Sequence, residues 1–126
     1  MPSDLVGDTP IPDTARVLDD AASTLVLPRQ SPTDVLAALH ARGIHAVWLE
    51  GGPTLAAAFL RAGLVDEIVA YLAPALLGAG RPAAADLDIT TIAEARRFDL
   101  VDATTLPSNE PPATDLRLRL RPTKEI

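Results

Sequence analysis

The residues of this chain best suited to bind a charged ligand are Glu50, Gly51, Gly52, Pro53 and Thr54. They follow the apolar run VWL and precede a string of helix formers, so they lie where a strand ends and a helix begins. Glycine lets a ligand approach the backbone without a Cβ in the way. Proline at the first helical position leaves the next amides free, and the helix dipole attracts an anion there. The run predicts a pocket for a nucleotide phosphate.

Glu50 would repel a phosphate, so we expect it to accept hydrogen bonds from an amide, amine or ribose hydroxyl of the ligand. The small residues Ala56, Ala57 and Ala58 allow the helix to lie close to a sheet or to the ligand. A second interpretation stays open, in which the two glycines form only a tight turn and the glutamate is solvated. The run is neither a G-x-G-x-x-G fingerprint nor a Walker loop, because no lysine follows the glycines.

Other polar residues give weaker signals. Arg81 lies in the glycine-containing loop LLGAGRP, which either closes on a ligand or is a surface loop. Arg117, Arg119 and Arg121 share one face of the last predicted strand, and a solvated face that protects a sheet edge is the favoured interpretation over a phosphate site. No Ser/His/Asp set or carboxylate pair is present in a catalytic pattern, so we predict no catalytic residue.

Composition narrows the function further. The chain has 126 residues, enough for one domain, and 48% of them are hydrophobic. Aromatic residues are only 3%, and the net charge is −6, so nucleic acid and anionic membrane are disfavoured as partners. There is no cysteine, and His40 and His45 lack ligand spacing, so we expect no disulfide and no metal site. Without a leader or an apolar span, the expected location is the cytoplasm.

The first two thirds of the chain alternate strands and helices. Residues 1–22 are expected to be an irregular lead-in, because they combine prolines and aspartates with little periodicity. The predicted strands are residues 23–28, 45–50 and 67–74, and the predicted helices are residues 32–42 and 53–62. This order is typical of a parallel α/β sheet with right-handed crossovers.

The last third changes pattern. Residues 75–87 are expected to form a loop, and residues 90–97 have helical character. Residues 97–106 and 114–122 alternate apolar and polar side chains around the turn PSNEPPA, which predicts an antiparallel hairpin with one solvated face.

The stretch VWLEGGPTLAAAFLRAGLVDEIVAYLAPALLGAGRP resembles the C-terminal reductase domain of the bifunctional bacterial riboflavin-biosynthesis deaminase/reductase family. The flanking segments agree in order, so the resemblance covers about residues 14–122. It implies a three-layer α/β fold like that of dihydrofolate reductase, with a mainly parallel sheet and a C-terminal antiparallel hairpin.

The resemblance also implies an activity. In that family the domain uses NADPH to reduce 5-amino-6-(5-phosphoribosylamino)uracil, a phosphorylated small molecule, to its ribitylamino form. Glu50 would then contact the substrate. The residues implied to line the cofactor site are Gly51, Gly52, Pro53, Thr54, Leu55, Ala56, Ala57 and Ala58. The nicotinamide supplies the hydride, which agrees with the absence of a predicted nucleophile.

The chain departs from the family pattern at its N-terminal side. Family domains begin with further strands that carry an SLDG-like stretch, and this stretch is missing here. We therefore expect residues 23–126 to be the second half of a reductase domain, and an uncovered half-sheet predicts a homodimer. Two alternatives remain open: a non-catalytic nucleotide-binding or dimerisation module, and a reductase of a related pteridine or folate substrate.

Overall fold

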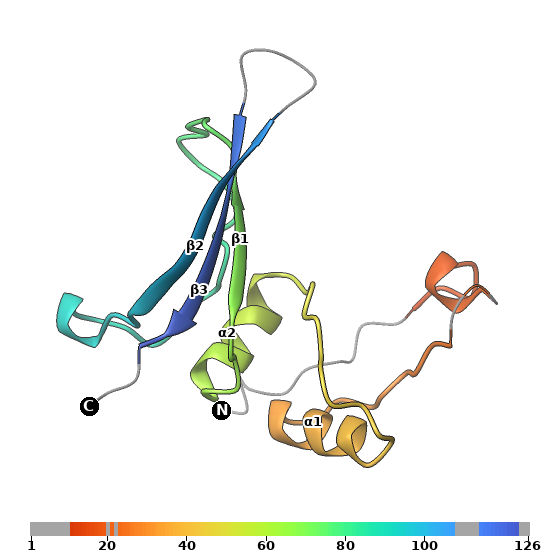
Figure 1. The fold of residues 1–126 in the computed structure, drawn as a ribbon. Coiled ribbons are helices and arrows are strands. Elements are labelled where there is room, and N and C mark those ends of the chain that lie inside the picture. The colour runs from red at the N-terminus through yellow and green to blue at the C-terminus, as the bar shows by residue number, and fades with distance from the viewer. Residues whose placement is uncertain (1–10, 20, 22, 108–113, 124–126) are drawn as a thin grey trace.

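The computed structural model describes residues 11–19, 21, 23–107 and 114–123. Its regular elements are two α-helices, three strands and two short 3-10 turns (Figure 1). In chain order they are a 3-10 turn at Arg16–Leu18, α1 at Pro32–His40, α2 at Pro53–Arg61, β1 at Ile68–Leu72, a 3-10 turn at Ile92–Glu94, β2 at Phe98–Pro107 and β3 at Thr114–Pro122.

Both predicted helices are confirmed, because their end signals are local. Ser31 caps α1, and its hydroxyl accepts a hydrogen bond from the amide of Asp34 at 3.2 Å. Each helix has proline in its first turn. Beyond their C-terminal ends, Gly43 has φ +80° and Gly63 has φ +67°, values that glycine adopts without strain.

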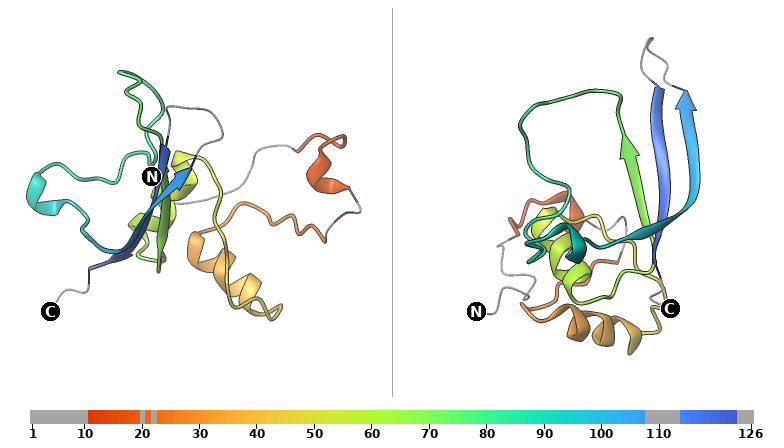
Figure 2. Two further views of the ribbon diagram at one scale, coloured as in Figure 1. Left: turned by 45° about the horizontal axis from the view of Figure 1, so that its top comes forward. Right: turned by 90° about the vertical axis from the view of Figure 1, so that its left-hand side faces the viewer.

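The described sheet is antiparallel and has the order β1-β3-β2. The predicted hairpin is confirmed as β2 and β3, although the turn at residues 108–113 lies outside the described residues. A register shift between Leu100 and Asp102 marks an irregularity in β2. Figure 2 shows the three strands as one twisted ribbon, with β1 at one edge.

The parallel part of the expected fold does not form in this structure. Residues 23–28 and 45–50 contain no strand, and no parallel strand pair occurs in the described residues. The third predicted strand is shorter than expected, at Ile68–Leu72, and it pairs antiparallel with β3. A strand needs a neighbouring backbone for its hydrogen bonds. Residues 23–28 and 45–50 have the side chains typical of a strand, but among the described residues no neighbouring backbone pairs with them.

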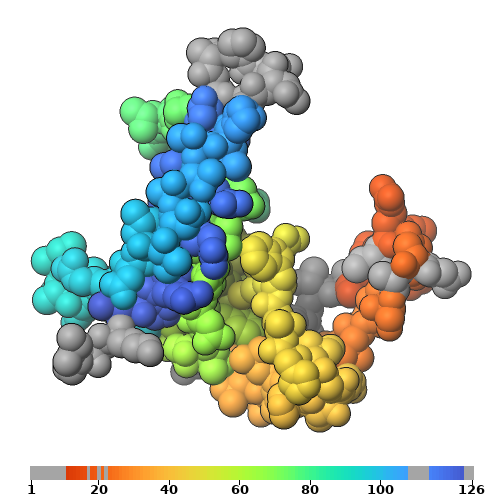
Figure 3. All heavy atoms as spheres, viewed as in Figure 1, coloured from red at the N-terminus to blue at the C-terminus, as the bar shows by residue number. Residues whose placement is uncertain are grey.

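Only a small part of the described chain is fully buried. The buried hydrophobic side chains are Ala57, Ala58 and Phe59, all on α2. The chain exposes 10273 Å² of surface, against about 6,400 Å² expected for a compact monomer of its mass. Figure 3 shows the β2–β3 hairpin standing clear of the segment that carries α1. The core is therefore incomplete.

Arginines on β3 form an ionic cluster with carboxylates from both sides. Arg119 donates to both oxygens of Glu67, at 2.8 and 3.1 Å, and Arg121 donates to the same carboxylate at 3.0 Å. Arg117 donates to Asp102 at 3.3 Å. Because β3 is the central strand, these arginines pair across the sheet, and the expectation that they protect a sheet edge is wrong.

The ionic cluster makes the free energy of unfolding change with pH in the acid range. Hydrogen bonds from Arg119 and then Arg121 hold the pKa of Glu67 below its usual value of 4.5. A carboxylate whose pKa is lowered by folding stabilises the folded state above its unfolded pKa. That stabilisation is lost as the pH falls through the lower, folded value.

We predict that Glu67→Gln lowers the free energy of unfolding at neutral pH, and that the difference from wild type shrinks as the pH falls below 4.5. Urea unfolding across the acid range measures both effects. Asp66→Asn, at the exposed neighbouring position, is the matched control and should keep the wild-type profile. A difference that stays constant with pH would contradict the role of Glu67.

Candidate functional site

The start of α2 differs from the start of α1 in what it offers an anion. Gly52 is the N-cap residue of α2 and has no side chain to bond the first amides, whereas Ser31 provides that bond in α1. The first turn of α2 also has no acidic residue, whereas α1 has Asp34 there. The amides of Thr54 and Leu55 belong to the helix start that intrahelical bonds do not satisfy. The geometry fits a bound phosphate group.

The two glycines of this corner have different surroundings. A Cβ on Gly51 would lie 2.1 Å from Cδ2 of Leu55 and 2.8 Å from its Cβ, so Leu55 leaves no room for a side chain. A Cβ on Gly52 would meet nothing within 4 Å. Gly51 is therefore explained by internal packing, which is the tight-turn interpretation. Gly52 leaves open space in front of the helix, as the ligand interpretation requires.

The three alanines on α2 face different surroundings. Ala57 and Ala58 are buried, and Ala56 is half-buried. Their small side chains thus allow close packing inside the protein. That they also line a cofactor site stays a prediction, as it does for the other residues of the corner.

Glu50 and Thr54 are exposed on either side of the glycines. The carboxylate of Glu50 accepts a hydrogen bond from Nε1 of Trp48, with a distance of 2.7 Å to Oε1. Sequence reasoning did not single out Trp48. The signal was available, because residues two apart on an extended chain point to the same side.

The loop after β1 returns to the same corner. The amide of Ala85 donates a hydrogen bond to the carbonyl oxygen of Pro53 at 2.9 Å. Arg81, four positions earlier, is exposed. The structure therefore brings the loop to the start of α2, and the role of Arg81 in binding a ligand stays a prediction.

An apolar groove of about 240 Å³ lies beside the corner. It runs between both helices and the two irregular segments that were predicted as strands. Its lining residues are Leu25, Leu27, Pro28, Val35, Val47, Leu49, Leu55 and Phe59. Every second residue of these segments lines the groove, while the residues between, Val26 and Trp48, are 60% and 67% exposed. One face of each segment thus lines the groove, and the other face is more exposed.

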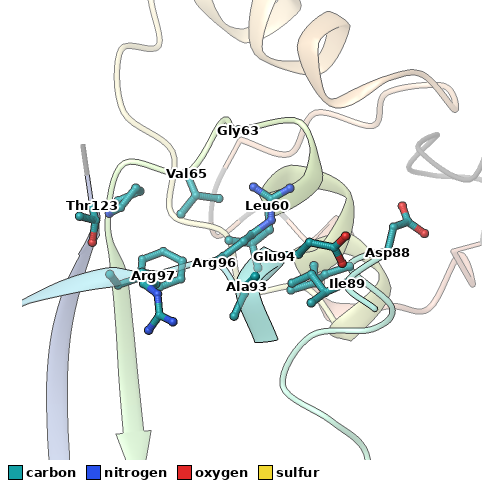
Figure 4. Close-up of a pocket in the computed structure, with 14 residues that line it drawn as sticks. Leu60, Gly63, Val65, Asp88, Ile89, Ala93, Glu94, Arg96, Arg97 and Thr123 are labelled. Carbon is teal, nitrogen blue, oxygen red and sulfur yellow. The ribbon is translucent and has the colours of Figure 1, made fainter. Parts of the chain in front are cut away.

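A larger cavity of about 730 Å³ lies at the other end of α2, where Leu60 and Gly63 line it (Figure 4). Its two acids have partners outside the lining, and Asp88 forms an ion pair with Arg61 at 3.8 Å. Glu94 accepts hydrogen bonds from the amides of Thr90 and Thr91, at 2.8 and 3.0 Å, and these bonds and the Thr90 hydroxyl lower the pKa of Glu94. Since its acids already have partners, this cavity is a weaker ligand site than the corner, despite its volume.

The described residues include no group of three or more His, Cys, Asp or Glu placed to hold a metal ion. His40 and His45 contact each other edge to face, with ring centroids 5.3 Å apart. Among the helices that the structure describes, none is long and apolar enough to cross a membrane.

The described structure thus combines an uncapped helix start beside an acidic residue with an antiparallel C-terminal hairpin. Residues 5–109 match the family described as the RibD C-terminal domain. The match covers most of the chain, and the chain belongs to this family.

Relatives in three organisms agree with this assignment. The riboflavin biosynthesis protein RibD of Mycobacterium tuberculosis H37Rv is 48% identical over 100 residues, which cover 78% of this chain and 29% of that protein. RibD of Escherichia coli is 63% identical over 35 residues, covering 28% of this chain and 10% of that protein. The 2,5-diamino-6-ribosylamino-4(3H)-pyrimidinone 5′-phosphate reductase of Methanothermobacter thermautotrophicus is 41% identical over 75 residues, covering 57% and 34%.

Solved structures share the fold. Acinetobacter baumannii RibD, form 2, superposes with a TM-score of 0.66 at 39% identity, over 77% of this chain and 26% of that one. Form 1 gives 0.63 at 37% identity, over 78% and 26%. The fold is thus α/β and of the dihydrofolate-reductase-like type that RibD has, and the chain spans about a third or less of the length of the relatives it matches.

The unequal surroundings of the two glycines give a matched pair of variants. We predict that Gly51→Ala lowers the free energy of unfolding by about 1–3 kcal/mol, because the new Cβ overlaps Leu55. Gly52→Ala should cost less, about 0.5 kcal/mol, since its Cβ meets no atom and Gly52 has φ −71°, so that only the poorer N-cap preference of alanine opposes it. Denaturant unfolding of both variants measures the difference, and equal losses would show that the corner is not packed as described.

Proposed function

We propose that this chain is part of an NADPH-dependent reductase of riboflavin biosynthesis, acting on 5-amino-6-(5-phosphoribosylamino)uracil. The observation that carries the proposal is the corner at Gly51 and Gly52. In a chain of the RibD C-terminal domain family, it leaves an uncapped helix start and open space at Gly52. The archaeal relative is named as a reductase of a ribosylamino pyrimidine 5′-phosphate, which supports the same substrate class.

The cofactor is assigned from the chemistry of the corner. A phosphate of NADPH would lie against the amides at the start of α2, with Gly52 giving backbone access. Bound there, NADPH would supply the hydride for the reduction. The role of this chain is to bind and orient the cofactor and the substrate. In this role Glu50 accepts hydrogen bonds from donor groups of the substrate.

The full reaction requires a more complete sheet than the described residues form. We propose that upstream strands, present in longer relatives, pair with β1 and with residues 23–28 and 45–50. Three observations support this: among the described residues β1 pairs only with β3, both segments have strand-like side chains, and one face of each lacks cover. The result would be the three-layer, mainly parallel sheet expected from the sequence.

We further propose a homodimer in the cytoplasm. Large apolar side chains on the sheet and the following loop lie at the surface, with Tyr71 62% and Leu77 85% exposed. Large apolar side chains exposed to this degree are unfavourable in a monomer when they gather into one patch. The incomplete core also favours one alternative, a binding or dimerisation module without catalysis, and an activity assay separates the two.

We predict NADPH oxidation with 5-amino-6-(5-phosphoribosylamino)uracil by this chain extended at its N-terminus with the residues that precede the matching segment in the Mycobacterium tuberculosis relative. The chain alone should turn over much more slowly, because its sheet is incomplete. Loss of NADPH absorbance measures both. Dihydrofolate is the substrate control and should not be reduced. No turnover by either chain would favour the binding module, and turnover of dihydrofolate would favour a folate reductase.

Two substitutions should affect the binding of NADPH and of the substrate separately. Gly52→Val should weaken NADPH binding about tenfold or more by filling the open space, with little change in substrate KM. Glu50→Gln should raise the substrate KM or lower kcat about tenfold, with NADPH affinity near normal. The measurement is quenching of Trp48, the single tryptophan, by bound NADPH, together with steady-state kinetics. The reverse pattern would place the ligands elsewhere.

A further inference from the structure

Trp48 is the single tryptophan of the chain, and the structure places it against the carboxylate proposed to bind the substrate. Its indole Nε1 lies 2.7 Å from Oε1 of Glu50, which is the short distance of a charge-assisted hydrogen bond. The segment that carries both residues is extended, so their side chains point to the same side. No other element is needed to bring them together.

The bond fixes one end of the carboxylate and leaves the other available. An ionised carboxylate has about four lone-pair sites on two oxygens. The indole uses one site on Oε1, and no hydrogen bond to Oε2 is formed by the described residues. A glutamate side chain loses rotamer entropy when it is ordered, so ordering it before a ligand arrives favours binding.

Packing within the described residues does not explain the position of Trp48. Its side chain is 67% exposed and lies on the side of its segment away from the apolar groove, which Val47 and Leu49 line. A large aromatic ring exposed to this degree contributes little to the described core. Its described polar contact is the bond to Glu50.

We propose that Trp48 is a positioning residue, which holds the Glu50 carboxylate so that Oε2 accepts an N–H or O–H donor of the substrate. This inference rests on the proposed function, since the donor belongs to the ribosylamino pyrimidine. It predicts that the indole N–H matters for the substrate and not for NADPH, whose phosphate would lie on the other side of Gly51.

The test removes the N–H and keeps a ring. In whichever form of the protein is active, Trp48→Phe should raise the KM for 5-amino-6-(5-phosphoribosylamino)uracil about threefold to tenfold. The KM for NADPH and the unfolding midpoint should stay at wild-type values. In a Glu50→Ala background, the same substitution should have no further effect on substrate KM, because Trp48 acts through that carboxylate. Tyr71→Phe, at another exposed aromatic position, is the matched control and should change neither KM.

The outcomes distinguish the inference from the proposed function. If the wild-type protein turns over the substrate and Trp48→Phe is equally harmful with and without Glu50, a general structural role replaces the positioning role. A rise in the KM for NADPH, or an unchanged substrate KM, also overturns the inference while the proposed function stands. Absence of turnover by every form overturns the proposed function and this inference with it.

Discussion

The close contact between Leu55 and Gly51 is the constraint on which the described structure depends most. It allows the backbone to enter α2 directly from the extended segment before it, because no side chain at Gly51 separates the two. The helix that follows carries the buried hydrophobic side chains of the described chain. The bond from Ala85 to Pro53 then ties the loop after β1 to the same point. The corner is therefore a packing centre as well as a candidate ligand site.

The charged side chains on the sheet have partners, whereas the apolar side chains beside the helices are only partly covered. On one face of β3, arginines find carboxylates from β2 and from the residue before β1, so the polar face is internally compensated. The apolar side chains of residues 23–28 and 45–50 line the groove beside the helices on one side only. This asymmetry is what a half-sheet should show, because charged pairs form between neighbouring strands, whereas burying both faces of a central strand requires a second layer.

Local signals in the sequence predicted most of the secondary structure that forms. Ser31 with Pro32, and Gly52 with Pro53, marked the helix starts, and the hairpin followed from the alternation of apolar and polar residues in β2 and β3. The strands predicted at 23–28 and 45–50 do not form in the described structure, because a strand is completed by hydrogen bonds to a partner that local sequence does not supply. The expected helix at 90–97 is a single 3-10 turn, closed by the capping box between Thr91 and Glu94.

The sequence by itself determined the diglycine corner, the two helices, the hairpin and the family to which the chain belongs. The reason is that caps, prolines and alternating patterns act over a few residues. Only the tertiary structure decided that Gly51 is occupied by Leu55 while Gly52 is open, that β3 is central, and that Trp48 bonds Glu50. These features depend on which atoms come together in space. Gly51 and Gly52 are adjacent residues of the same type, yet a side chain at each would meet different neighbours.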